Sequence, residues 1–441
     1  MMMIRILLVL LCATPVLAQN DSIDSIIQKE YGSLENLYKH LHSNPELSYQ
    51  EEKTSARIAE ELRKLGFEVT EKFGTYQEPN RTAYGIVAVM KNGPGPTVMV
   101  RTDLDGLPME EKTGLPYASK VKAKNDEGIE VPVMHGCGHD MHMTVFVGAA
   151  RGLSSMKNQW KGTLIMIGQP AEERAPGGAS AMLRAGLYSK FPKPDYVLAL
   201  HNGASTPAGK VAWVEGYALA SVDTVDITIR GVGGHGAYPA DTKDPVVIAA
   251  ETVLALQTIV SREVRPGKAA VITVGSIHGG TKHNIIPDDV KLQLTVRSYE
   301  KDIREILLKG IERITNGIAQ AAGVPKGKEP VIDFHPNDYL PATYNNPDLV
   351  RKTLPAFEAA LGKQNVIPTD PVMAAEDFSY YSLEDLSVPS FLFWLGAVDP
   401  RRVQSGEKLP SLHSSKFAPV PETTIKTGVK AMTAAVMNLM K

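Results

Sequence analysis

The chain has 441 residues, and its 47 lysines and arginines nearly balance its 49 aspartates and glutamates, giving a formal net charge of −2. This balance offers no general electrostatic attraction for nucleic acid or for an anionic membrane, so neither is expected as a partner. A chain of this length exceeds what one hydrophobic core usually organises, and two domains are expected.

Residues 1–18 have the pattern of a secretory signal peptide. One positive charge, Arg5, precedes an apolar run over residues 6–11, and the ending Val16-Leu17-Ala18 precedes Gln19. A membrane anchor is disfavoured because a helix needs roughly 20 apolar residues to cross a bilayer. We expect cleavage near Ala18-Gln19 and a secreted or periplasmic mature protein.

Short apolar runs alternate with helical stretches through the first half of the mature chain. Helices are predicted over residues 54–65 and 144–156, and strands over 98–102, 163–167 and 196–200. Such an alternation favours an α/β/α domain with a mostly parallel central sheet.

The pattern changes near residue 217 and returns to α/β after Pro341. In between, the order of predicted elements is β-α-β-β-α-β, with strands at 225–230, 270–276, 290–299 and 331–334 and helices at 245–264 and 301–322. This order is that of a ferredoxin-like α+β module. A helix over 348–361 and a strand over 390–395 then follow. We therefore expect an inserted domain at 217–335 that divides a larger domain into the parts 19–216 and 336–441.

Cys137 and His139 form a Cys-x-His pair in the segment Met134-His135-Gly136-Cys137-Gly138-His139-Asp140. Cys137 is the only cysteine left after residues 1–18 are set aside, so it has no disulfide partner within the mature chain. A Cys-x-His pair by itself is more often a packing feature. The solitary thiol makes a metal ligand an equally good interpretation.

Other potential ligands follow the predicted strands. Asp103 and Asp105 come after the strand at 98–102, the pair Glu172-Glu173 after the strand at 163–167, and His201 directly after the strand at 196–200. Ligands in open α/β sheets bind outside the carboxyl ends of the strands, so these side chains should converge on one edge.

Taken singly, each of these residues has an ordinary explanation. Adjacent glutamates are usually solvated. A lone histidine such as His201 or His413 usually lies on the surface, or in the core with its hydrogen bonds satisfied. Their joint occurrence with Cys137 instead predicts a metal-dependent hydrolase.

Thiolate, imidazole and carboxylate together suit Zn²⁺, whereas Mn²⁺ favours oxygen and nitrogen ligands. Two ions roughly 3.5–4 Å apart can lower the pKa of a bridging water, whose proton a free carboxylate can take.

The motifs together resemble the M20 metallopeptidase family, which contains aminoacylases and glutamate carboxypeptidases. The matching segments are Met134-His135-Gly136-Cys137-Gly138-His139-Asp140, Gln169-Pro170-Ala171-Glu172-Glu173, Leu200-His201, Gly233-Gly234-His235-Gly236-Ala237 and Ala375-Glu376-Asp377-Phe378. They occur in the family's order from about Leu37 to the C-terminus. Within the family, the chain is similar to the amidohydrolases that include hippurate hydrolases and auxin-conjugate hydrolases.

The resemblance implies a site for two divalent ions, Zn²⁺ or Mn²⁺, with Glu172 as general base. The implied metal ligands are Cys137, His139, Glu173, His201 and His413. Many family members begin this site with a His-x-Asp pair, where this chain has Asp103. Asp103 and Asp105 are therefore expected to orient ligands, with direct ligation by Asp103 as the alternative.

His235 lies in Gly231-Val232-Gly233-Gly234-His235-Gly236, which formally matches the dinucleotide-binding pattern G-x-G-x-x-G. The match is weak because Pro239 and Asp244-Pro245 delay the next helix, which leaves the glycines away from a helix N-terminus. In the resembled family this loop belongs to a lid domain, and its histidine reaches the active site of the partner subunit. The resemblance thus implies that His235 stabilises an oxyanion in trans.

Two further lid positions match residues that contact substrate in relatives, Asn284 and Arg297. An arginine can clamp a carboxylate through two parallel hydrogen bonds. An exposed strand residue is nearly as good an interpretation of Arg297. His142, His278 and His283 are interpreted as structural residues or as residues that support the ligands.

The chain is therefore expected to be a homodimeric, metal-dependent amidohydrolase that cleaves the amide bond of N-acyl amino acids or related small conjugates. Carboxypeptidase or dipeptidase action on short peptides is an alternative that uses the same residues. A non-catalytic binding protein with the same fold is another, against which the presence of Glu172 argues. The acyl group, the amino acid and the metal remain open.

Overall fold

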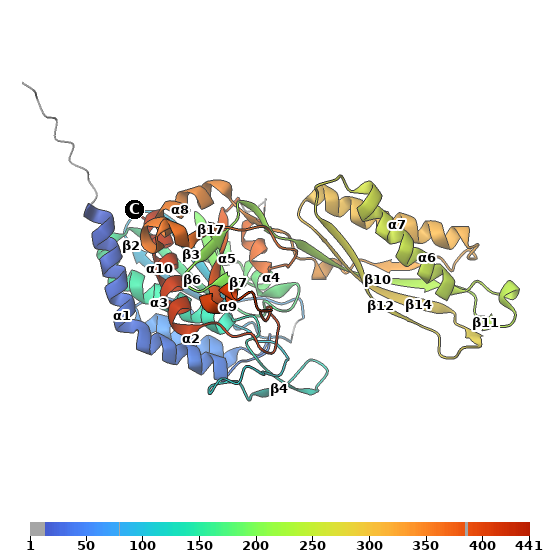
Figure 1. The fold of residues 1–441 in the computed structure, drawn as a ribbon, viewed down its shortest axis with the longest axis horizontal. Coiled ribbons are helices and arrows are strands. Elements are labelled where there is room, and N and C mark those ends of the chain that lie inside the picture. The colour runs from blue at the N-terminus through green and yellow to red at the C-terminus, as the bar shows by residue number, and fades with distance from the viewer. Residues whose placement is uncertain (1–13, 79, 384–386) are drawn as a thin grey trace, which may run out of the picture.

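The computed structural model describes residues 14–78, 80–383 and 387–441, which form two lobes joined by extended segments (Figure 1). The expected signal peptide lies outside the described residues as far as residue 13. Helix α1 (Thr14–Ser43) runs through the expected cleavage position, and cleavage stays a prediction.

The larger lobe is built on an eight-stranded sheet in the order β1-β2-β6-β3-β7-β18-β8-β17. Its central strands β6, β3, β7 and β18 are mutually parallel, which confirms the expected α/β class with a mostly parallel sheet. The bounds are β1 (Glu68–Thr70), β2 (Ile86–Asn92), β6 (Gly162–Gln169), β3 (Thr97–Asp103), β7 (Tyr196–Pro207), β18 (Ser390–Val398), β8 (Val211–Trp213) and β17 (Val366–Pro368).

Both faces of this sheet are buried. In β6, Leu164 and Met166 pack into one core, while Ile165 and Ile167 pack into another on the opposite face. This two-sided burial explains why the strand is a continuous apolar run rather than an alternating one. The first core lies under α1, α2 (Glu52–Lys64), α3 (His139–Ser155), α8 (Pro347–Leu361) and α10 (Pro421–Leu439), and the second under α4 (Gly177–Arg184), α5 (Leu187–Lys190) and the 3₁₀ segment η6 (Asp377–Ser382).

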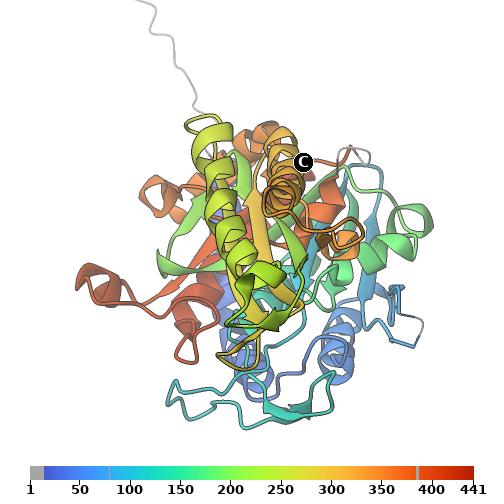
Figure 2. The same ribbon diagram turned by 90° about the vertical axis from the view of Figure 1, so that its right-hand side faces the viewer.

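The smaller lobe, here called the lid, contains a four-stranded antiparallel sheet in the order β12-β14-β10-β15. Two helices cover one face of it (Figures 1 and 2). The order β-α-β-β-α-β is the ferredoxin-like order expected from the sequence. Its elements are β10 (Ser221–Arg230), α6 (Pro245–Thr258), β12 (Ala270–Gly279), β14 (Asp289–Ser298), α7 (Lys301–Ala321) and β15 (Val331–Asp333).

The segment Pro245–Glu263 begins with α6 and ends in a π-helical turn over Ile259–Glu263. Within the described residues it is the one helix long and apolar enough to cross a membrane by length and composition alone. Ile248 and Leu256 are buried against the lid sheet, whereas Val247 and Leu254 are 54% and 73% exposed. The helix is thus apolar on its outer face as well as on the face that packs.

Candidate metal centre

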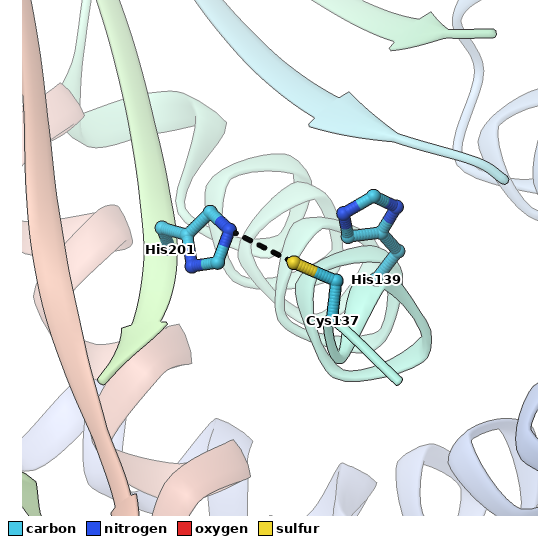
Figure 3. A group of neighbouring side chains, drawn as sticks. All are labelled: Cys137, His139 and His201. Carbon is cyan, nitrogen blue, oxygen red and sulfur yellow. Dashed lines mark hydrogen bonds between the residues drawn. The ribbon is translucent and has the colours of Figure 1, made fainter. Parts of the chain in front are cut away.

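Cys137, His139 and His201 form a buried cluster where α3 begins (Figure 3). The Cys137 sulfur lies 3.4 Å from Nε2 of His201, which belongs to β7. His201 therefore lies within a strand rather than after one, because β7 continues past Leu200 alongside β18. Gly138, between Cys137 and His139, has a φ of 85°, and an added Cβ would lie 2.3 Å from the Asn202 side chain. Only glycine fits there.

Glu173 and His413 complete the cluster on its solvent side. Nε2 of His413 lies 3.2 Å from Oε1 of Glu173, and the His413 side chain is 53% exposed. Nε2 of His139 lies 3.8 Å from carboxylate oxygens of both Glu172 and Glu173. The backbone N–H of His413 donates to the carbonyl of Gly136 at 2.9 Å, which fixes its loop against the Cys137 loop. The structure thus brings together all five ligands that the sequence predicts.

The unpaired atoms and charges of this cluster fit bound cations. Nδ1 of His139 lies 2.8 Å from the carbonyl oxygen of Asp105, and its buried Nε2 has no hydrogen-bond partner among the described residues. A proton on Nδ1 leaves the Nε2 lone pair free for a metal. Burial, and then the charges of Glu173 and Glu172, raise the pKa of the Cys137 thiol well above its usual value. A divalent cation would reverse this effect and favour the thiolate.

Cys137→Ser is expected to weaken metal binding by at least about 10-fold, because a hydroxyl is a poorer ligand than a thiolate. Metal retained against a graded series of chelator concentrations measures the change, and thermal unfolding of the metal-free proteins controls for a folding defect. Equal retention by parent and variant would remove Cys137 from the ligand set.

Asp103 lies beside the cluster with both carboxylate oxygens occupied. One accepts from Nη1 of Arg101 at 2.8 Å and the other from Nδ1 of His142 at 2.8 Å. Nε2 of His142 in turn accepts from the backbone N–H of Asn202 at 2.9 Å, which fixes its tautomer. These bonds place Asp103 and His142 in one network, and Oδ2 of Asp103 lies 3.7 Å from Nε2 of the predicted ligand His139. Whether Asp103 orients ligands or binds metal directly stays a prediction.

Asp105 organises the loop that carries Glu172 and Glu173, here called the glutamate loop. Its Oδ1 accepts from the backbone N–H of Glu172 at 3.1 Å, and its Oδ2 accepts from that of Glu173 at 3.0 Å. Ser48 donates to the same Oδ2 at 2.6 Å. One buried carboxylate therefore sets the backbone of both glutamates.

Arg101 was not identified from the sequence, although it lies at the centre of the buried charges. Its guanidinium donates to Glu376 at 2.8 Å, to Asp377 at 3.1 Å and to Gln169 at 2.9 Å, besides Asp103. A charged residue inside an otherwise apolar strand was the available signal. Removing this cation would leave several carboxylates buried without a partner, which is strongly destabilising.

Glu172 faces a cavity of ≈ 530 Å³ between the lobes. Its side chain is 9% exposed. Burial raises the pKa of Glu172 well above its usual value, and the charges of Glu376 and Glu173 raise it further. Arg297 also lines the cavity, where it is half-buried and donates to the carbonyl of Met373 at 2.7 Å. The structure thus brings the predicted base and this lid residue to one space.

His235 and Asn284 lie elsewhere. They are exposed at the end of the lid farthest from the larger lobe, where β11 (Gly234–His235) pairs with β13 (Ile285–Ile286) (Figure 1). The backbone N–H of Gly236 donates to the Asn284 carbonyl at 2.9 Å. Neither side chain lines the cavity of the same subunit. His278 and His283 are exposed on the lid as well.

His42 connects α1 to the helix that carries His139. Its Nδ1 lies 2.6 Å from Oδ2 of Asp140, and its Nε2 lies 3.0 Å from Oε1 of Glu111. Burial lowers the pKa of His42, but hydrogen bonds to Asp140 and Glu111 outweigh it and raise the pKa to about 10. The imidazolium therefore neutralises two buried carboxylates below that pH.

His42→Leu is expected to lower the free energy of unfolding by about 3–5 kcal/mol at pH 6, because it leaves buried carboxylates uncompensated. The His42 pKa is higher in the folded state than the ordinary 6.5 of the unfolded state, so its stabilisation is complete below pH 6.5 and is lost as the pH rises through about 10. The parent–variant difference should therefore shrink between those values in urea denaturation. His40→Leu, on the exposed side of the same helix, is the control. If His42→Leu lowers the free energy of unfolding no more than His40→Leu does, the ion-pair account is contradicted.

The sequence profile of "Peptidase family M20/M25/M40" matches residues 99–438. The chain is 37% identical over 392 residues to thermostable carboxypeptidase 2 of Saccharolobus solfataricus, covering 89% of this chain and 91% of that protein. It is 36% identical over 352 residues to the hippurate hydrolase of Campylobacter jejuni, covering 79% and 85%. A solved dinuclear metal-binding M20 peptidase from Bacillus subtilis superimposes with a TM-score of 0.73 at 27% identity, covering 94% of this chain and 100% of that one.

Proposed function

We propose that this member of peptidase family M20/M25/M40 cleaves the amide bond of N-acyl amino acids or related small conjugates. The chain is a metal-dependent hydrolase with two divalent metal ions as cofactor. The observation that carries the proposal is one cavity that holds Glu172, four of the predicted ligands and Arg297. A general base, a ligand cluster and a cationic side chain there provide for both amide hydrolysis and recognition of a carboxylate.

The residues divide the work as follows. Cys137, His139, Glu173, His201 and His413 would hold the divalent ions, which would supply a water of lowered pKa. Glu172 takes the proton of that water and returns it to the leaving amine, a task suited to a carboxylate whose pKa is raised by burial. Asp105 holds the Glu172 backbone, and Asp103 holds His142 through a hydrogen bond.

The cavity wall indicates how the substrate lies. Arg297 offers a guanidinium for the carboxylate of the amino-acid part. Much of the remaining wall is apolar and suits an acyl group, with contributions from Leu219, Val222, Leu340, Trp394 and Leu412. A volume of ≈ 530 Å³ accommodates a small conjugate rather than a folded polypeptide.

Carboxypeptidase action on short peptides is the second candidate, favoured by the 37% identity to a thermostable carboxypeptidase. The two candidates differ only in the group on the acyl side of the scissile amide. Metal-reconstituted protein assayed for amine release from N-acetyl and N-benzoyl amino acids and from dipeptides separates them. A kcat/KM highest for the N-acyl amino acids supports the proposal, and one highest for dipeptides supports the alternative. Turnover on neither class would contradict both.

We further propose a homodimer that forms through the lid. Leu254 on α6 is 73% exposed, and Ile277 on β12 is 54% exposed. Among the described residues, β12 is also an edge strand, which pairs with β14 on one side only. An exposed apolar helix beside an open strand edge is the kind of surface that a second copy covers.

Export from the cytoplasm is also proposed, on the pattern of residues 1–18. N-terminal sequencing of protein recovered outside the cytoplasm is expected to begin near Gln19. A chain that keeps its initiating methionine in the cytoplasm would contradict it.

A further inference from the structure

The loop that carries Glu172 and Glu173 is held by its backbone. Three successive N–H groups each donate to a buried carboxyl group: Ala171 to Oε1 of Glu51 at 2.7 Å, and Glu172 and Glu173 to Asp105 at 3.1 and 3.0 Å. Ala171 itself has a φ of 47°, in the left-handed region that residues with a Cβ rarely adopt. Such a conformation persists only where surrounding contacts enforce it.

Glu51 contacts Ala171 from outside the loop. It lies 120 positions earlier in the chain and is fully buried. It occupies the N-cap position of α2, yet its side chain makes no capping hydrogen bond to that helix. Side chains at this position usually accept from the first turn of their own helix. Here the carboxyl group reaches across to Ala171 instead.

We propose that Glu51 is a positioning residue for catalysis, which holds Ala171 in its left-handed conformation and thereby directs Glu172 into the cavity. The hydrogen-bond acceptor is what matters for this role, not a negative charge. Burial, followed by the charge of Asp105, raises the pKa of Glu51 to about 8, which favours the neutral form of the group. A glutamine, which has the same shape and keeps a carbonyl oxygen, should therefore substitute for it.

A purely structural role predicts different behaviour. If Glu51 only stabilised the packing around α2, its loss would lower stability without changing turnover by the folded enzyme. Glu46 provides a matched comparison in the same region. Its Oε2 accepts from the backbone N–H of Thr54 at 2.7 Å in the first turn of α2, and no hydrogen bond joins its side chain to the glutamate loop among the described residues.

The test compares Glu51→Ala, Glu51→Gln and Glu46→Ala as metal-loaded enzymes on an N-acyl amino acid that the parent hydrolyses. Glu51→Ala is expected to lower kcat by about 10–100-fold with KM within about twofold and metal content unchanged, because a small displacement of a catalytic group is costly. Glu51→Gln and Glu46→Ala should keep kcat within about threefold of the parent. If Glu51→Ala does not fold, Glu51→Met, which fills the space without an acceptor, replaces it.

Three results would overturn the proposal: an unchanged kcat in Glu51→Ala, an equal loss in Glu51→Gln or Glu46→Ala, or loss of metal from Glu51→Ala. The inference rests on the proposed function through the role of Glu172. Hydrogen–deuterium exchange of the Ala171, Glu172 and Glu173 amides separates the two. Faster exchange in Glu51→Ala alone supports the positioning role even if the parent turns over no N-acyl amino acid, and unchanged exchange contradicts that role.

Discussion

Glu172→Gln is expected to lower kcat by at least about 10²-fold while the enzyme keeps the metal content of the parent. The amide has the size of the carboxyl group and still fits the wall of the cavity, but it cannot take a proton from water and return it to an amine. Amine release gives kcat, and elemental analysis of the dialysed protein gives the metal content.

Glu173→Gln is the matched control, since it makes the same chemical change one position later. Oε1 of Glu173 lies 3.2 Å from Nε2 of His413, among the implied ligands. This variant should therefore lose metal, and its activity should rise when metal is added in excess. If Glu173→Gln keeps its metal while Glu172→Gln loses it, the two roles are the reverse of those proposed.

The strands that bear the site were predictable because their sequences are simple. Residues 98–102 and 163–167 are short runs, largely apolar, and the structure buries them on both faces in β3 and β6. The carboxyl ends of such strands lie at one edge of a parallel sheet. This is why Asp103 and Glu172 could be placed near one another without a structure.

Other elements gave no such signal. Helix α10 is buried around most of its surface, so its sequence lacks the polar stripe of an amphipathic helix. β7 extends through the polar residues after Leu200, where pairing with β18 makes it a strand. In both cases tertiary contacts decide the structure, and the local spacing of apolar residues does not reveal those contacts.

The supporting residues of the site were hidden by sequence separation. Arg101 meets Glu376 across 275 positions, and Glu51 meets Ala171 across 120. No spacing rule connects such pairs. Ligand types could be inferred from chemistry, whereas the residues that aim them appear only once the chain is folded.

His235, like Asn284, is a predicted site residue that does not line the cavity of its own subunit. It is exposed at the far end of the lid, and that cavity is lined by other residues. His235→Ala is therefore expected to leave metal content and folding intact while lowering kcat by roughly 10²–10³-fold, the usual cost of losing one oxyanion donor. A loss of this size is the result expected if His235 enters the site of a second subunit, as the proposed homodimer implies.

Subunit exchange tests that requirement directly. In a heterodimer of His235→Ala and Glu172→Gln subunits, one site combines an intact Glu172 with an intact His235 from the partner subunit. Random exchange should therefore restore about a quarter of the parental activity, because half of the dimers are heterodimers and each heterodimer has one complete site out of two. Each variant exchanged with itself is the control and should stay inactive. If native mass spectrometry verifies the heterodimer and activity does not return, His235 acts within its own subunit or takes no part in the reaction.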